Sequence, residues 1–253
     1  MPQKKKVVEI RFYEELNDFL PLEKHKITFH HPFSGNPTIK DLIESLRVPH
    51  TEIDLIIVNG NSVDFSYAVQ DHDKISVYPT FESLDITPII KLRPEPLRDP
   101  KFILDVHLGK LAKYLRLLGF NVLYDNHYDD KNIIEIAKSQ HRIILTRDIG
   151  ILKNKTVTHG YWVRNIDWKE QVAEILTRFE LFSKIAPFTR CLECNGVLEP
   201  IEKSKIEDQL PPKTKKFYQR YAKCPECNRI YWEGTHYEKM KKFVGDTGSC
   251  LNS

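Results

Sequence analysis

Two cysteine pairs with identical spacing constrain this chain more than any other feature of its sequence. Two residues separate the members of each pair, and a few tens of residues separate the pairs. This repeated Cys-x2-Cys pattern is typical of a structural zinc site with four thiolate ligands, here Cys191, Cys194, Cys224 and Cys227. Asn195, Gly196 and Asn228 tolerate the left-handed backbone that such tight turns require. A zinc ribbon is therefore the leading interpretation, and a disulfide pair or a redox centre is the alternative.

The sequence predicts a protein that works in a reducing compartment and outside the membrane. No apolar run approaches the roughly 18 residues that a membrane-spanning helix needs. The lysines at positions 4–6 lead into a short apolar run that Glu9 and Arg11 interrupt, so we expect no signal peptide. We therefore expect a cytoplasmic location, in which thiols stay reduced and can bind zinc. Cys250 is left as an odd cysteine in a polar tail, residues 245–253.

Charge is distributed unevenly along the 253 residues. Residues 1–95 contain 11 Lys and Arg against 15 Asp and Glu, whereas the remainder contains 27 against 20. The second part is thus basic and could bind a polyanion, although a zinc ion with four thiolates would remove about two of its positive charges. Charge alone therefore indicates a polyanionic partner only weakly.

The first part of the chain has the pattern of a compact α+β domain, which we place at residues 1–85. Apolar runs predict strands at residues 7–13, 26–30, 55–59 and 74–78. Thr38 can cap a helix that runs to Val48, and Asn59-Gly60 predicts a turn between the later strands. The order strand, strand, helix, strand, strand is that of a β-grasp, or ubiquitin-like, domain.

Prolines separate this domain from a second one. They fall in residues 86–100 and predict a stiff, extended linker. From residue 101 the pattern alternates between strands, at 102–104, 121–124, 142–146 and 161–163, and helices, at 108–118, 133–139 and 168–182. This alternation predicts an α/β fold with a parallel sheet and right-handed crossovers. We assign this domain to residues 101–186 and the zinc ribbon to residues 187–244.

Acidic residues stand at the carboxyl ends of the predicted strands of the second domain. Asp105 directly follows one strand, Asp148 follows another after Arg147, and Asp125, Asp129 and Asp130 follow a third. The carboxyl ends of parallel strands form the functional edge of an open sheet, where several carboxylates would repel one another without a cation between them. Hard oxygen ligands suit Mg²⁺ or Mn²⁺, which can activate water for attack on a phosphodiester.

Each of these acids also has an ordinary structural interpretation. Asp105 could begin a turn, and Asp148 could be solvated or cap the segment after it. Asp130 could stabilise the start of a helix in which Asn132 and Glu135 have capping-box spacing. Their joint position at strand ends favours metal-dependent phosphodiester cleavage over these alternatives.

Basic side chains could contact the phosphates of a nucleic acid at two places. One face of a predicted helix carries Lys110, Lys113 and Arg116. A second group, with aromatic neighbours that could stack on bases, lies between the cysteine pairs and includes Lys215, Lys216 and Arg220. Arg147, beside Asp148, could contact a phosphate or pair with a carboxylate. Either group of basic residues could instead be a solvated surface.

Several motifs occur together in an order that resembles a known family. They are Asp105 followed by LGKLAKYLRLLGF at 108–120, ILTRD at 144–148, the two cysteine pairs, and YWEGTHY at 231–237. This set is similar to the PIN-like RNase family named for the C-terminal domain of the mut-seven exonuclease, and the resemblance runs from about residue 101 to 240. Residues 48–52, 58–60 and 78–79 resemble the ubiquitin-like domain that is often fused in front of it.

The resemblance implies a PIN-type fold, a divalent-metal centre and RNA as the substrate. It implies Asp105, Asp130 and Asp148 as ligands of Mg²⁺ or Mn²⁺, with Arg147 and Arg116 in support. We expect a metal-dependent ribonuclease whose zinc ribbon makes the substrate groove rigid. The alternatives are an RNA-binding adaptor that keeps the fold without turnover and a phosphatase-type domain, which ranks last because its Asp-x-Asp signature is absent.

The ubiquitin-like domain also resembles β-grasp sulfur carriers. Those carriers need a free C-terminal Gly-Gly, whereas this chain continues from Pro79 into Thr80. Sulfur transfer is therefore not expected, and a role in docking a protein partner or positioning RNA is left for this domain.

Overall fold

The computed structural model describes residues 5–79, 100–234, 237–239, 241–243 and 245. The predicted linker lies outside these residues except for Pro100, and so do Cys250, Thr235 and His236. The chain divides into two compact units. The first combines Met1–Asp99 with Ala137–Trp162, and the second combines Pro100–Ile136 with Val163–Ser253. Within the described residues, every helix is too short or too polar to span a lipid bilayer.

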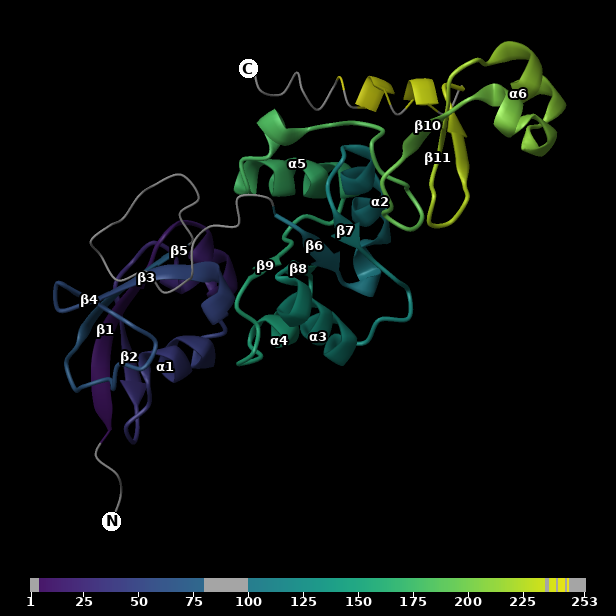
Figure 1. Ribbon diagram of the computed structural model, residues 1–253. Helices are drawn as coiled ribbons and strands as arrows, with labels where there is room; N and C mark the ends of the chain where they lie inside the picture. The colour runs from purple at the N-terminus through teal and green to yellow at the C-terminus, as the bar shows by residue number, and fades with distance from the viewer. Residues whose placement is uncertain (1–4, 80–99, 235–236, 240, 244, 246–253) are drawn as a thin grey trace. The chain divides into compact units, whose positions relative to one another are not determined.

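A five-stranded mixed sheet forms the centre of the ubiquitin-like domain (Figure 1). Its order is β2-β1-β5-β3-β4, and its strands are β1 (Lys6–Phe12), β2 (Phe29–Phe33), β3 (Ile53–Val58), β4 (Asn61–Val63) and β5 (Lys74–Pro79). β1 pairs in parallel with β5, and the other neighbours are antiparallel. The helix α1 (Ile39–Ser45) joins the core through its apolar face. The predicted β-grasp arrangement is confirmed, with β4 as an additional short strand.

Local side-chain and backbone geometry explains where the elements of this domain begin and end. The Thr38 hydroxyl accepts the Asp41 N–H at 3.2 Å, and the Asp41 carboxylate accepts the Thr38 N–H, so the predicted cap of α1 is confirmed as a capping box. α1 stops before Val48 because Arg47 has a φ of 72°. β2 starts later than predicted because Lys26 has a φ of 58° and donates its N–H to the Asn17 side chain.

The second sheet has four strands in the order β7-β6-β8-β9. They are β6 (Phe102–Leu104), β7 (Val122–Leu123), β8 (Ile143–Thr146) and β9 (Gly160–Trp162). β6 pairs in parallel with β7, and β8 pairs in parallel with β9. All residues of β6 and β8 are buried, as parallel sheets require. The predicted PIN-like α/β fold is confirmed.

Four helices follow the strands of this sheet: α2 (Gly109–Leu117), α3 (Asp130–Gln140), α4 (Ile149–Leu152) and α5 (Trp168–Arg178). In the second unit α2 packs against α5. α2 ends in a Schellman motif, in which Gly119 has a φ of 97° and the Phe120 N–H donates to the Leu115 carbonyl. α5 ends in the same way at Glu180, with a φ of 50°, so it stops at Arg178 rather than at residue 182.

The ribbon is a three-stranded antiparallel sheet in the order β10-β11-β12 (Figure 1). Its strands are β10 (Glu199–Ile201), β11 (Tyr221–Lys223) and β12 (Ile230–Trp232), and α6 (Pro212–Phe217) precedes β11. Its apolar core is small and is built on Ile206, Leu210 and Tyr221. A core of this size gives little stability alone, which is why a metal site is expected beside it.

Candidate functional site

The four predicted zinc ligands lie together in the ribbon. Their sulfur atoms are all within 4.8 Å of one another, with 3.5 Å between Cys191 and Cys227 and 3.4 Å between Cys194 and Cys224. These separations are too long for a disulfide bond of about 2.05 Å. They are near the separation of about 3.8 Å expected for thiolates that share a tetrahedral zinc at about 2.3 Å. The donor set therefore fits a structural zinc ion.

The two cysteine pairs turn in the same way. Asn195, with a φ of 71°, donates its N–H to the Cys191 carbonyl, and Asn228, with a φ of 60°, donates to the Cys224 carbonyl. The left-handed backbone predicted for both asparagines is thus confirmed. Gly196 is needed for a different reason, because a Cβ atom there would lie 2.9 Å from the Cys224 sulfur.

The hydroxyl of Tyr231 lies beside the thiol of Cys191. It accepts the Leu192 N–H at 3.0 Å and approaches the Cys191 sulfur to 3.1 Å. Burial raises the pKa of Cys191, but hydrogen bonds from the Cys194 N–H, the Tyr231 hydroxyl and the Glu193 N–H oppose it and bring the pKa down to about 7. Since zinc binds the thiolate, these donors favour the form that the metal requires.

Arg116 corrects one prediction from the sequence. Its side chain is not on an exposed helix face, because the residue is 4% exposed. The guanidinium donates to the carbonyls of Val122 at 2.9 Å, Glu193 at 2.7 Å and Leu192 at 3.0 Å. With its donors committed to backbone oxygens, Arg116 fastens the first cysteine pair to α2 and β7 and is not available to RNA. The sequence does contain a sign of this burial, because Arg116 stands in an otherwise apolar run, residues 115–118.

A second set of contacts joins the ribbon to β7, which is an edge strand of the four-stranded sheet, and to the residues just before β7. The Asn195 side chain accepts the Val122 N–H at 2.8 Å and donates to the Asn121 side chain at 2.9 Å. Arg190 donates to the Gly119 carbonyl at 3.1 Å. The ribbon thus satisfies the Val122 N–H of the edge strand, which would otherwise need another partner.

Asp105 lies where β6 ends, as predicted, and it is buried. It caps the short helix η4 (Val106–Leu108) by accepting the His107 N–H at 3.2 Å. The pKa of Tyr124 is raised by burial and then by the negative charges of Asp105 and Asp125. The side chains of Asp105, Tyr124 and Asp125 therefore lie near one another in the second unit. Gly109 makes room there, because a Cβ atom would lie 2.6 Å from the Tyr124 hydroxyl. The sequence analysis did not identify Tyr124.

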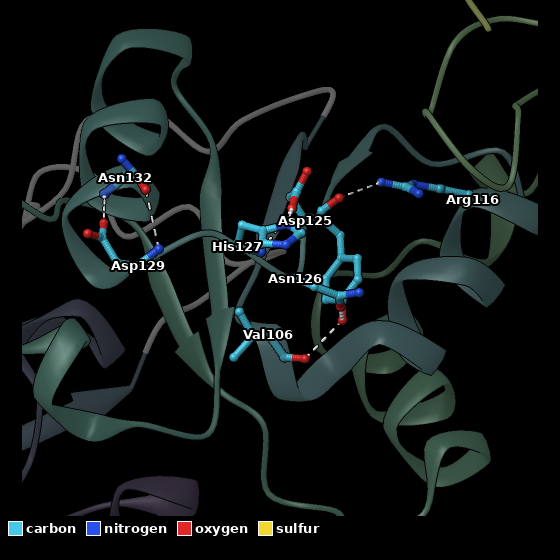
Figure 2. A network of polar contacts seen from close by, with 8 residues as sticks. Val106, Arg116, Asp125, Asn126, His127, Asp129 and Asn132 are labelled. Atoms are coloured by element: carbon cyan, nitrogen blue, oxygen red, sulfur yellow. Dashed lines mark hydrogen bonds and ion pairs between the residues drawn. The ribbon is translucent and has the colours of Figure 1, made fainter.

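The acids after β7 have distinct local roles, and Figure 2 shows the contacts of Asp125 and Asp129. Asp125 accepts the backbone N–H of His127 at 2.9 Å, and this hydrogen bond lowers the pKa of Asp125. The Nδ1 atom of the His127 ring also lies 2.9 Å from the Asp125 carboxylate. Asp129 accepts the Asn132 N–H at 2.8 Å, and the Asn132 side chain accepts the Asp129 N–H. The cap of α3 is therefore Asp129, not Asp130. Asp130 is the exposed first residue of the helix.

Asp148 lies in the first unit, separated from the end of β8 by Arg147, and is exposed. Its carboxylate accepts the Gly150 N–H at 2.6 Å and so caps α4, while its own N–H donates to Thr146 at 2.8 Å. A carboxylate that accepts one such bond keeps further lone pairs for a ligand. Asp105 and Asp130 belong to the second unit, and Asp148 and Arg147 belong to the first. The convergence of these four residues stays a prediction.

The ribbon also lines a cavity of about 670 Å³ in the second unit. Aromatic and basic side chains surround it, among them Phe217, Tyr218, Trp232, Lys213 and Arg220. Lys215 pairs with Glu207 at 3.1 Å, and Arg220 lies 3.7 Å from Glu233. Phe217 is 67% exposed and therefore accessible to a ligand.

Lys110 and Lys113, on α2, are exposed as predicted.

Two family models match the chain. The model described as Mut7-C RNAse domain matches residues 100–244, and the model described as Mut7-C ubiquitin matches residues 5–85. No curated protein and no solved structure matches the chain. The two matched ranges confirm the resemblance inferred from the ordered motifs.

Removal of one cysteine should remove the zinc. We expect one zinc ion per wild-type chain after dialysis, measured by inductively coupled plasma mass spectrometry, and far less in Cys194→Ser because structural zinc needs all four ligands. Cys250→Ser is the control and should keep its zinc, since Cys250 has no partner at the ligand spacing. Full zinc content in Cys194→Ser would contradict the site.

Substitution of Arg116 should lower the stability of the folded protein and should not act through contacts with RNA. In Arg116→Lys the donors to Val122, Leu192 and Glu193 are lost or misplaced, so the free energy of unfolding should fall by about 1.5–3 kcal/mol. Urea unfolding in the presence of zinc measures this. Lys113→Met, on the exposed part of α2, should change it by no more than about 0.5 kcal/mol. An Arg116→Lys protein as stable as this control would contradict the assignment.

Proposed function

The chain belongs to the Mut7-C RNAse domain family, and on that premise we propose that it is a metal-dependent ribonuclease that hydrolyses RNA phosphodiester bonds. One structural observation supports the proposal in addition to the family match. In a parallel sheet, β6 is followed at once by Asp105, and β8 is followed, after Arg147, by Asp148. In open parallel sheets the carboxyl ends of the strands form the edge where ligands bind.

In this proposal Asp105, Asp130 and Asp148 hold Mg²⁺ or Mn²⁺. Carboxylate oxygens are the donors that these hard cations prefer, so the residues fit the ion. A bound ion of this kind supplies a water of lowered pKa and neutralises negative charge on the phosphate. The burial of Asp105 strengthens its interaction with a cation, because the charge is poorly screened there. Arg147 would hold a phosphate oxygen of the substrate.

We propose that RNA reaches this site along the basic side chains of α2 and the ribbon. Lys110 and Lys113 would neutralise phosphates, and Lys215, Lys216 and Arg220 would do so at the ribbon. The aromatic residues of the ribbon cavity offer faces on which unpaired bases can stack. A single-stranded substrate fits this combination, since paired bases have no face exposed. We place this activity in the cytoplasm, where the thiols of the ribbon stay reduced.

The second candidate is an RNA-binding adaptor with little or no turnover. It is favoured by the capping hydrogen bonds of Asp105 and Asp148, which give both residues a structural reason to be acidic. The two candidates share the same RNA-binding surface and differ only in metal-dependent cleavage.

Neutralisation of the three acids should separate the candidates. Asp105→Asn and Asp148→Asn should lose nearly all Mn²⁺-dependent cleavage of single-stranded RNA, because the amide is a poor cation ligand, and unfolding should stay cooperative because Asn also caps helices. Asp130→Asn should lose activity, whereas Asp129→Asn should retain it, since Asn keeps the cap of α3. Tight RNA binding by the wild type without any metal-dependent cleavage would favour the adaptor.

The ribbon cavity can be tested by RNA binding alone. In the inactive Asp105→Asn background, Phe217→Ala should raise the Kd for a single-stranded oligonucleotide by about 5- to 150-fold, because base stacking on an aromatic ring contributes about 1–3 kcal/mol. Phe217→Tyr keeps the ring and should bind as the parent does. Equal Kd values for all three proteins would rule out this cavity as an RNA site.

A further inference from the structure

A buried glutamate of the ubiquitin-like domain holds the last strand of the RNase sheet. Glu52 ends the short helix η3 (His50–Glu52) and is 1% exposed. Its Oε1 atom accepts the backbone N–H of Trp162 at 2.6 Å. A buried carboxylate is costly unless it is hydrogen-bonded, so this short bond is a strong one. Since Trp162 is the last residue of β9, Glu52 fixes the carboxyl end of that strand.

The side chain of Trp162 extends this contact to the segment that carries Asp148. Its ring packs on Phe19 of the ubiquitin-like domain, with 5.0 Å between ring centroids, and against the core of that domain. Its indole N–H donates to the Arg147 carbonyl at 3.3 Å. Arg147 immediately precedes Asp148. A single side chain thus links the ubiquitin-like core to the backbone that bears the proposed metal ligand.

The residues after Asp148 are held by the same domain. Ile149 packs against its apolar core. Lys153 donates to the Glu44 carbonyl at 2.9 Å, and the His50 ring nitrogen lies 2.9 Å from the Val157 carbonyl oxygen. All these contacts fall within one compact unit of the chain. The ubiquitin-like domain therefore holds the chain both before and after Asp148.

The segment that the ubiquitin-like domain contacts, residues 147–152, has little stability of its own. α4 has only four residues, Ile149–Leu152, and so short a helix has little stability of its own. A carboxylate that binds a catalytic ion must be held to within about 0.5 Å. The contacts supply that restraint from outside the helix while the Asp148 carboxylate stays exposed to a ligand.

We propose that the ubiquitin-like domain positions Asp148 for RNA cleavage, with Phe19, Glu52 and Trp162 as the positioning residues. The domain would act within its own chain as a rigid support for the RNase site. The catalytic part of this proposal rests on the proposed function of Asp148. The mechanical part, restraint of residues 147–152 by the domain, does not.

Two pairs of matched variants test the proposal in the full chain. Trp162→Phe keeps a ring on Phe19 and removes the indole N–H, and Trp168→Phe is its control on α5, where the ring stacks on Tyr114. Phe19→Leu weakens the support from the side of the ubiquitin-like domain. Its control is Phe29→Leu, because both phenylalanines belong to the same core and are 8% exposed.

Hydrogen exchange measured by mass spectrometry reports the restraint directly. Trp162→Phe and Phe19→Leu should speed amide exchange in residues 147–152, and both controls should exchange there as the wild type does. In Mn²⁺-dependent cleavage, the same two variants should lower kcat by about three- to tenfold with KM unchanged, since loss of one hydrogen bond or ring contact disturbs the position of a group that acts in the transition state.

The outcomes separate the two parts of the account. Unchanged exchange in residues 147–152 would overturn the support, and faster exchange with unchanged kcat would overturn its role in catalysis. Effects of equal size in the control variants would mean general destabilisation and would also overturn the proposal. Absence of cleavage by the wild type would instead refute the proposed ribonuclease, and the exchange data would still decide whether the domain restrains this segment.

Discussion

The second unit depends on the buried guanidinium of Arg116. A charge taken out of water is stable only where every donor finds an acceptor, and here the acceptors are backbone carbonyls of β7 and of the first cysteine pair. The four cysteines lie together within the ribbon and fit a zinc ion, whereas Arg116, with Asn195 and Arg190, attaches the ribbon to α2 and the sheet edge. The ribbon also covers part of the edge strand β7, since the Asn195 side chain accepts the Val122 N–H.

The acids that follow the strands have a structural role as helix caps, whether or not they also bind a metal. Asp105, Asp129, Asp148 and Asp167 each accept a backbone N–H at the start of the following helix. A carboxylate that follows a strand and precedes a helix stabilises the start of that helix, so each of these acids has a structural reason to stand at its position. A metal site can use carboxylates that are already in place. The cap of α3 is made by Asp129 and Asn132, so Asp130→Asn leaves both of these residues in place.

The sequence was sufficient where the determinants are local. Cysteine spacing, the capping box at Thr38, the turn at Asn59-Gly60 and the apolar runs of β6 and β8 predict structures that involve neighbouring residues. It was insufficient where the partner is distant in the chain. The burial of Arg116 depends on carbonyls 76 and 77 residues away, and the bond from Trp162 to Glu52 spans 110 residues. No spacing rule predicts such pairs, so the role of the ubiquitin-like domain could be inferred only from the folded chain.

The central claim is that Asp105, Asp130 and Asp148 bind one catalytic metal centre. The most direct measurement is anomalous X-ray scattering from crystals of the full chain soaked in Mn²⁺. The account predicts a manganese peak within about 2.3 Å of carboxylate oxygens of Asp105 and Asp148. Manganese peaks elsewhere, or none at these two aspartates in crystals that hold the ion at saturating concentration, would contradict it.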